Sequence, residues 1–485
     1  MQVQLSQFSP QQQAQSLAQA PVSQAEQNRK QQMGDAWKAY QGEFQKPLKV
    51  AANQPDDNVL SNRCSPIVDK GVSFLFGPVL KIECDDQDFV DGLWGDDDER
   101  MTLLSKMAIN GGAFGQVFVK LIPASGNMKY PRLVNLDPRV VRIVTDPEDC
   151  DLHLAYVIEY PGFNDVQKRQ VIARVDPDDD LEFAGNDLRD TWTITNYVRR
   201  GQSGTWQQQG EVEDWPYPFA PVLTWQNLPN PNEPIGKPDL TPDLVQLNKV
   251  LNFVQSNTSR IIKYHAHPKT WGKGFRASQM SVAVDDVFVI EAPDGSLQNL
   301  EMTSNLESSR AFAGDIRSDM DEQSRVPAVA LGRLESLPKG NISGVALQLL
   351  FQPLTEKTVQ KQRLYGCGVR DVTRASMVVA GKISIEEYED YQVDLHWQNL
   401  LPVDDLAAAQ TGLILKQIGI SDSTIQSQLG YDPDDEADKS AVEDQKKMEA
   451  YSRGQGFPPP SPQQQPGQTP AQPGQQQATQ PGGER

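Results

Sequence analysis

Apolar and polar positions follow two different spacings along the chain, and these spacings predict its helices and strands. Met101, Leu104 and Met107 recur every three to four residues, which predicts a helix over about 98–112 that ends at a Gly-Gly pair. Runs of β-branched and aromatic residues predict strands at 116–122, 140–146, 154–160 and 191–200. A helix followed by mainly antiparallel strands indicates an α+β fold.

Two longer helical patterns, from about Pro242 to Tyr264 and from about Thr303 to Arg325, bracket a short β-rich segment. Thr241 is suited to cap the first helix. Its apolar residues form a narrow seam, which is typical of a helix that packs along a long neighbour. The residues assigned to this packing are Leu244, Leu247, Leu251, Val254, Ile261, Leu306, Ile316 and Met320.

A third long helix is predicted from Ser343 toward Ala380. Pro353 lies inside it and is expected to kink it, because proline lacks a backbone donor and its ring clashes with the preceding turn. A loop precedes this helix, and a helical, acidic stretch (402–450) follows it after a gap.

Composition places the polar excess at the two ends of the chain. Residues 1–33 are rich in Gln, Ala and Ser, with too few large apolar side chains to nucleate a core, and 452–485 are rich in Gln and Pro and predicted to be disordered. The N-terminus lacks the pattern of a signal peptide, and the apolar runs are too short to cross a membrane. We therefore expect a soluble protein made in a cytoplasm, with no membrane partner.

Net charge excludes one class of function. With 45 Lys and Arg against 65 Asp and Glu, the formal charge is −20. Such acidity argues against a protein that grips nucleic acid through a broad basic face.

Catalytic motifs are absent from the sequence, including a P-loop, a G-x-S-x-G elbow and H-E-x-x-H. Acidic clusters at 85–88, 96–99, 176–180 and 432–436 could serve hydrolytic chemistry, but they lack basic or histidine partners and are interpreted as solvated loops. His265 and His267, with His153 and His396, could bind a metal, although polar residues at a helix end are the favoured interpretation. We expect no catalytic residues, no metal and no cofactor.

Basic residues gather around the end of the first long helix. Lys263, Lys269, Lys273 and Arg276 alternate with Tyr264, Trp271 and Phe275. A phosphate-facing patch, a protein-docking surface and a solvated loop all remain open. The loop residues Arg333, Glu335 and Lys339 have mixed charge and indicate no nucleic-acid specificity.

Five segments, in this order, resemble the portal proteins of tailed bacteriophages. They are the opening segment 61–83, the helix and strands at 109–160, the helix leading into PKTWGKG (244–274), the stretch 325–354 with Ser343, Gly344, Ala346 and Leu347, and the helical region 400–439. The resemblance implies a twelve-membered ring at the capsid vertex with a mixed α/β wing, long paired stem helices, a small β-rich clip, a kinked helix and an α-helical crown.

In this chain the implied parts would fall as follows: a flexible N-terminal arm (1–45), the first part of the wing (46–240), stem helix 1 (241–266), the clip (267–302), stem helix 2 (303–327), the tunnel loop (328–342), the kinked helix and second part of the wing (343–400), the crown (401–451) and a disordered tail (452–485). The narrow seam of stem helix 1 would then be buried by lateral packing against copies of itself.

The resemblance also implies a passive conduit for double-stranded DNA in packaging and ejection. The terminase large subunit and later a head-completion adaptor would dock at the clip, and the major capsid and scaffolding proteins would be further partners of this virion component, assembled in the host cytoplasm. Carboxylates facing the channel would repel phosphates and let DNA slide. The residues given these roles are Gly332, Arg333, Glu335, Lys339 and Gly340 in the tunnel loop, Gly344 and Pro353 at the kink, and Lys269, Trp271, Lys273, Phe275 and Arg276 in the clip.

Two other classes remain as alternatives. A metal-dependent hydrolase would use one of the acidic clusters, and chelation would abolish its activity. A scaffold or adaptor would bind partners through the Gln/Pro-rich ends without forming a ring. The seam at 244–261 argues against the scaffold, because it predicts specific self-association.

Overall fold

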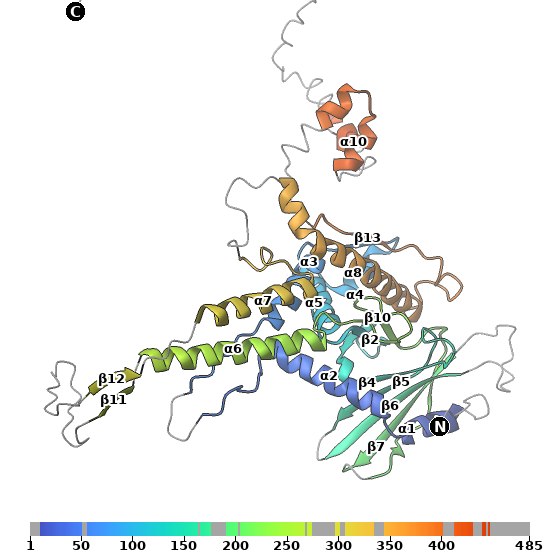
Figure 1. The fold of residues 1–485 in the computed structure, drawn as a ribbon. Helices are drawn as coiled ribbons and strands as arrows, with labels where there is room; N and C mark the ends of the chain where they lie inside the picture. The colour runs from blue at the N-terminus through green and yellow to red at the C-terminus, as the bar shows by residue number, and fades with distance from the viewer. Residues whose placement is uncertain are drawn as a thin grey trace, which may run out of the picture. The chain divides into compact units, whose positions relative to one another are not determined.

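A computed structural model describes most of the chain and divides it into two compact units, residues 1–402 and 403–485 (Figure 1). The described residues are 10–50, 56–162, 165–175, 191–201, 204–266, 269–273, 296–300, 306–333, 344–400, 412–429, 439–442 and 445–446. Among them, no helix is both long enough and apolar enough to span a membrane.

The first unit mixes helices with antiparallel sheets, as the hydrophobic pattern predicts. Its helices are α1 (Pro10–Gln19), α2 (Gln24–Gln41), α3 (Cys64–Phe76), α4 (Gln87–Trp94), α5 (Asp97–Phe114), α6 (Pro242–Ala266), α7 (Leu306–Ser324) and α8 (Gly344–Val379). Its strands are β1 (Lys81–Glu83), β2 (Gln116–Ile122), β3 (Arg132–Leu136), β4 (Val141–Thr145), β5 (His153–Pro161), β6 (Val166–Val175), β7 (Thr191–Arg200), β8 (Gln207–Gln208), β9 (Glu213–Trp215), β10 (Val222–Gln226), β11 (Lys269–Lys273), β12 (Ser296–Leu300) and β13 (Asp394–His396).

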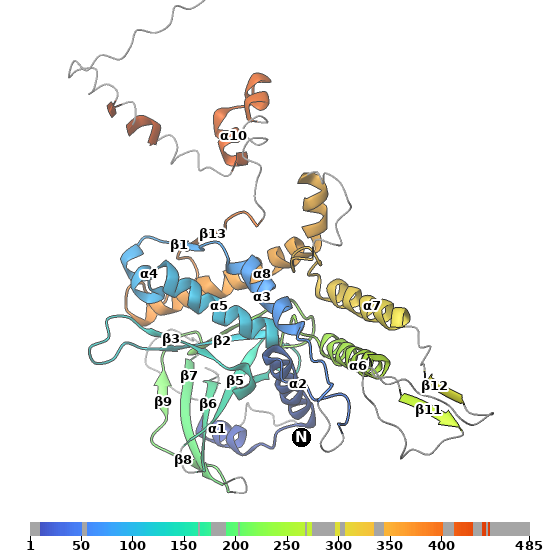
Figure 2. The same cartoon turned by 90° about the vertical axis from the view of Figure 1, so that its left-hand side faces the viewer.

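Two antiparallel sheets form the body of this unit. One has the order β10-β2-β3, and the other has the order β4-β5-β6-β7-β8 with β9 paired to β7. The strands predicted at 116–122, 140–146, 154–160 and 191–200 are confirmed as β2, β4, β5 and β7. Figure 2 shows the second sheet below α5 and beside α1.

The main core lies between α3, α5, α8 and the three-stranded sheet, with Leu104, Val119 and Tyr365 fully buried. The prediction that the Gly-Gly pair ends α5 is wrong. Gly111 and Gly112 lie inside the helix, and a Cβ on Gly111 would stand only 1.9 Å from the hydroxyl of Tyr365. The glycines therefore permit close packing, while Gly115, with φ of 87°, ends the helix.

The N-terminal segment is not the flexible arm that the sequence suggested. Helices α1 and α2 pack on the unit, and Ala14, Ala18 and Ala36 are buried. Large apolar side chains are scarce in this segment, as the composition indicates. Alanine side chains are small, however, so each helix lies close to the sheet or helix on which it packs. Ser23 caps α2 by accepting a bond from the Glu26 amide, at 3.2 Å.

Candidate functional site: the stem hairpin and the kinked helix

Helices α6 and α7 lie side by side (Figures 1 and 2). Helix α6 starts where predicted, with the Leu244 amide donating to Thr241 Oγ1 at 3.4 Å, and it continues to Ala266. Helix α7 runs over Leu306–Ser324. The pair forms the hairpin that we call the stem.

The predicted seam is buried, but within one chain. Leu244, Leu251, Ile316 and Met320 share a cluster with residues from α3 and α8, and Leu247 and Val254 pack against it. Ile261 and Leu306 are half-buried and lie outside this cluster. The expectation that copies of the chain cover this seam is therefore wrong, because α7, α3 and α8 already do so.

Other apolar side chains of the stem face solvent. Phe253 is 48% exposed, Ile262 45% and Phe312 52%. Phe312 borders a hollow of about 330 Å³ between the two helices, which Val254, Asn257, Ser308 and Ser309 also line. An exposed phenylalanine beside a hollow, with further exposed apolar side chains on the same hairpin, is a typical feature of a surface that contacts another protein.

A polar stripe on α6 holds an extended segment, residues 57–63, which we call the strap. Asn248 Oδ1 accepts from the Arg63 amide, Asn252 Oδ1 accepts from the Ser61 amide, and Ser256 Oγ accepts from the Val59 amide, each at 2.9 Å. Arg260 continues the stripe and binds the carboxylate of Asp57, also at 2.9 Å.

The spacing of the polar residues on α6 matches the spacing of the residues that they bind in the strap. Four residues of helix rise about 6 Å, and two residues of extended chain span about 6.6 Å. Side chains four apart on α6 therefore meet every second residue of the strap. Asn248, Asn252 and Ser256 are each no more than 1% exposed. The apolar pattern of the sequence does not predict this stripe, although Asn and Ser at i, i+4 and i+8, beside the apolar seam of an amphipathic helix, are a recognisable signal.

A buried charge cluster joins the stem to α8. Asp239, which precedes α6, forms ion pairs with Lys357 (2.8 Å) and Lys361, and all three side chains are no more than 4% exposed. Lys357 Nζ also donates to the carbonyl of Ser324, the last residue of α7, at 2.9 Å. A Cβ on Gly112 would lie 2.9 Å from Asp239 Oδ2, so this glycine makes room for the carboxylate.

The pKa values of the cluster show which forces act there. Burial would raise the pKa of Asp239, but the two ammonium groups outweigh it and lower the pKa to about 2. Burial lowers the pKa of Lys361 to about 8; the Asp239 carboxylate opposes this shift, and the charge of Lys357 adds to it. Helix α8 is therefore fixed to the end of α7 and the start of α6 by one carboxylate shared between two lysines.

The described part of the predicted tunnel loop is anchored to the stem. Arg333 forms an ion pair with Asp321 on α7, which also binds Arg63 at 3.1 Å. Gly332 has φ of 80°, a backbone conformation that favours glycine. Glu335, Lys339 and Gly340 lie outside the described residues. The DNA-facing role assigned to this loop stays a prediction.

Helix α8 is a continuous α-helix from Gly344 to Val379, and Pro353 lies inside it, as predicted. Both views show the helix bent between its short first part and its long second part (Figures 1 and 2). Leu347 and Leu349 of the first part are 41% and 63% exposed.

Strands β11 and β12 pair antiparallel in the segment predicted to be the clip. Lys269, Trp271 and Lys273 lie on β11, with Trp271 opposite Gln298. Phe275 and Arg276 lie outside the described residues. The docking role of these residues stays a prediction.

Two of the acidic clusters have structural roles. Asp86 caps α4 by accepting from the Phe89 amide at 3.1 Å, and Asp96 caps α5 by accepting from the Glu99 amide at 2.8 Å. The clusters at 176–180 and 432–436 lie outside the described residues.

Of the histidines in the described part of the chain, His153 contacts the Tyr156 hydroxyl and His396 pairs with Glu83. No group of three or more His, Cys, Asp or Glu in that part is arranged to hold a metal ion.

In the second unit, residues 412–417 and α10 (Asp422–Leu429) are helical, in the region predicted to be the crown. Leu413, Ile414 and Ile418 are 63%, 58% and 69% exposed, so this short helical region presents an apolar face.

Comparison with known proteins identifies the family. The family of phage portal proteins described as SPP1 Gp6-like matches residues 19–450. Similar solved structures include chains from the virion of a native gene transfer agent particle (13% identity, TM-score 0.43) and from the neck of an empty gene transfer agent particle computed with C6 symmetry (12% identity, TM-score 0.45). Each likeness covers 76% of this chain and 90% of the other. None of the curated proteins compared with the chain matches it. Because the family match spans most of its length, the chain belongs to the phage portal proteins of the SPP1 Gp6-like family.

Proposed function

We propose that this portal protein assembles into a ring at the capsid vertex and acts as a passive conduit for double-stranded DNA during packaging and ejection. Family membership is the first support. One chain similar to this one comes from the neck of a native gene transfer agent particle that was computed with C12 symmetry, and a ring of twelve copies would have that symmetry. The terminase and the head-completion adaptor would dock on this ring, and the major capsid and scaffolding proteins would surround it.

The observation that carries the ring proposal is the exposed apolar surface of the stem. Phe253 and Phe312 are each about half exposed on helices whose own seam is already buried. Apolar side chains exposed on the stem favour a contact that removes them from water, and a neighbouring copy would supply that contact. A contact between two different surfaces closes into a ring when the rotation between copies permits.

Electrostatics support a channel along which DNA slides. The chain has a formal charge of −20, so a ring of copies would repel phosphates over most of its surface. Arg333, in the segment that we propose as the tunnel loop, forms an ion pair with Asp321 near the end of α7. We infer that a few basic residues at this level would centre the duplex.

Native mass spectrometry with negative-stain images tests the proposal. We expect a closed ring of about twelve copies with a central hole. A protein that stays monomeric or dimeric at every concentration would remove the conduit mechanism, and a non-ring scaffold would then be the better explanation.

A further inference from the structure

The sheet face that holds α1 differs from the rest of this acidic protein. Helix α1 lies across β6 and β7, with Ala14 and Ala18 buried against Val157, Val171 and Tyr197. Its two buried alanines are four residues apart, so one side of a helix with small side chains fits the face.

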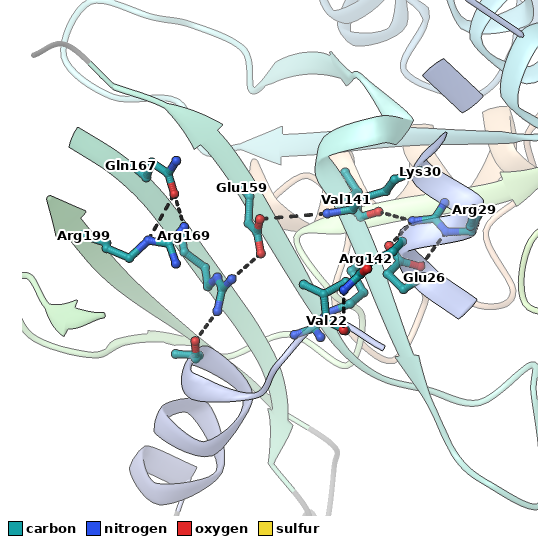
Figure 3. Close-up of polar contacts among 12 residues, drawn as sticks. Val22, Glu26, Arg29, Lys30, Val141, Arg142, Glu159, Gln167, Arg169 and Arg199 are labelled. Carbon is teal, nitrogen blue, oxygen red and sulfur yellow. Dashed lines mark hydrogen bonds and ion pairs between the residues drawn. The ribbon is translucent and has the colours of Figure 1, made fainter. Parts of the chain in front are cut away.

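Arginines bind the C-terminal end of α1. The carbonyl of Ala18 accepts a hydrogen bond from Arg169 Nη1, and the carbonyl of Leu17 accepts one from Arg142 Nη2 at 3.3 Å. Figure 3 shows Arg169 between the end of this helix and Glu159. The last carbonyls of a helix have no partners within it and carry partial negative charge, so cations are stabilising there.

The positive charge exceeds what α1 can balance. Arg169 is 5% exposed and stacks 4.1 Å from the ring centre of Trp206, and Arg199 stacks on the same ring at 4.5 Å. Together with Arg142 and Lys30 these are four cations. Among the residues labelled in Figure 3, Glu159 is the one carboxylate that pairs with any of these cations, and it contacts Arg169 and Lys30. The other labelled carboxylate, Glu26, pairs with Arg29 instead. The end of a helix supplies only about half a negative charge.

Several buried donors of this face are also without acceptors. Among the described residues, Arg169 Nε, Arg142 Nε and the hydroxyl of Tyr197 have no hydrogen-bond partner. A buried donor left unpaired costs about 1–3 kcal/mol. Burial lowers the pKa of Arg169, Glu159 opposes this shift, and the charges of Arg142 and Arg199 add to it. The face therefore offers more binding capacity for negative charge than α1 uses.

Helix α1 is also a weak occupant. Its ten residues read PQQQAQSLAQ, with five glutamines and no carboxylate. Isolated helices of this length are unstable in water, so α1 depends on the sheet to stay folded.

We propose that this face is a docking site for the C-terminal end of a partner protein's helix, one with small side chains four residues apart and a carboxylate in its last turn. Helix α1 fills the site in cis until such a helix replaces it. The carboxylate would bind the arginines that α1 leaves incompletely neutralised, so charge complementarity selects the partner over α1. This inference does not depend on ring formation.

The test uses the full chain with α1 expelled. The double substitution Ala14→Lys and Ala18→Lys places bulk and positive charge on the buried side of α1. Lysines at the exposed positions 12 and 15 give a control with the same added charge. Two labelled peptides, PQQQAQSLAQ with an amidated end and the same peptide with a Glu added after its last residue, are then titrated by fluorescence anisotropy; both keep Gln19, which donates to the Trp206 carbonyl.

We expect the expelled variant to bind the Glu-ending peptide at least tenfold more tightly than the amidated one, with the preference lost at high salt. Adding Arg169→Met should remove the preference, and the control variant should bind both peptides at least tenfold more weakly. Equal binding of both peptides by the folded, expelled variant, or binding of neither, overturns the proposal. Equal binding would identify α1 itself, from this chain or a second copy, as the true occupant.

A second measurement covers the case in which the expelled variant does not fold. Ala20→Glu in the otherwise unchanged chain places a carboxylate directly after α1 and should slow hydrogen exchange in residues 10–19 several-fold, and Ala20→Lys should accelerate it by a similar factor. Gln19 is kept unchanged, because its Nε2 donates to the Trp206 carbonyl at 2.8 Å. Exchange rates that do not respond to the charge at this position contradict the charge-based selection.

Discussion

Asp239 lies where the start of α6, the end of α7 and the middle of α8 meet. Its carboxylate is shared by Lys357 and Lys361, which leaves one net positive charge in the core. A buried ion pair adds little net stability compared with apolar packing, yet losing one partner costs several kcal/mol. We infer that the cluster serves to position the helices: Lys357 also binds the Ser324 carbonyl, and it thereby fixes α8 to the last residue of α7.

Single substitutions in this cluster should be ranked by the charge they leave unpaired. Asp239→Asn leaves two buried ammonium groups and should cost about 3–5 kcal/mol of unfolding free energy. Lys357→Met leaves a neutral pair but also strands the Ser324 carbonyl, so it should cost less. Lys361→Met leaves the Asp239–Lys357 pair intact and should cost least. Denaturant unfolding of the three variants checks the ranking, and an equal loss for all three would contradict it.

The pH dependence of stability should reveal Lys361. Its pKa of about 8 in the folded protein is below the ordinary value of 10.5, so the unfolded chain binds more protons between these values. Stability therefore rises with pH through this window, by linkage. Lys361→Met should flatten the rise between about pH 8 and 10, measured as the pH dependence of Tm relative to the unchanged protein. An unchanged slope would indicate that Lys361 titrates normally.

At the scale of elements, the long periodic patterns are predictable from sequence and the contacts between distant residues are not. The seam from Leu244 to Val254 predicts α6 and its packing on a long neighbour, because helical spacing is a local property. The seam does not show whether that neighbour belongs to the same chain. In the structure the neighbour is α7, which belongs to the same chain. Asp239 and Lys361 lie 122 residues apart, and no local pattern connects them. The hydrophobic pattern does not predict helix α1, because its buried side chains are alanines, which give no strong hydrophobic signal.

The strap is positioned largely by side chains of α6 that accept hydrogen bonds from its backbone amides. Asn252 accepts from the Ser61 amide, so Asn252→Ala should leave a buried donor unpaired and cost about 1–3 kcal/mol. Hydrogen exchange in residues 59–63 should accelerate by at least tenfold, while exchange in α7 stays the same. Gln246→Ala, at an exposed position of the same helix, is the matched control and should change neither. Unchanged exchange in the strap would show that other contacts hold it.

At the scale of the whole molecule, the stem divides its apolar residues between two tasks. One set, around Leu251 and Met320, is buried inside the chain, and the other, Phe253 and Phe312, is left at the surface. The first set secures the hairpin in a single copy. The second is therefore available to contacts between copies, and substitutions there should separate assembly from folding.

Phe312→Asp should weaken the ring without unfolding the subunit. A buried aromatic contact at an interface contributes about 2 kcal/mol, which corresponds to about a thirtyfold change in each contact between copies. Because a closed ring has one such contact per subunit, we expect native mass spectrometry to show mostly monomers at concentrations where the unchanged protein forms rings. The circular dichroism spectrum should not change. Gln246→Asp adds the same charge elsewhere on the stem and should leave rings intact.

Docking at the clip should be separable from both folding and ring assembly. Trp271 lies on β11 in the segment between the stem helices, and Phe275 follows it closely in the sequence. Replacing both with Ala removes the two apolar anchors that we assign to the terminase contact, and no residue of the stem changes. Rings should therefore form normally, while terminase binding by the purified ring falls at least tenfold and DNA packaging fails.

The same double variant decides what the clip does if packaging continues. Normal packaging by rings with both alanines would exclude these side chains as anchors. The basic residues Lys269 and Lys273 on β11 would then be the next candidates, and their contribution would be recognised by its loss at high salt. An apolar contact is far less sensitive to salt, so comparing terminase binding at low and high ionic strength distinguishes the two kinds of docking surface within one experiment.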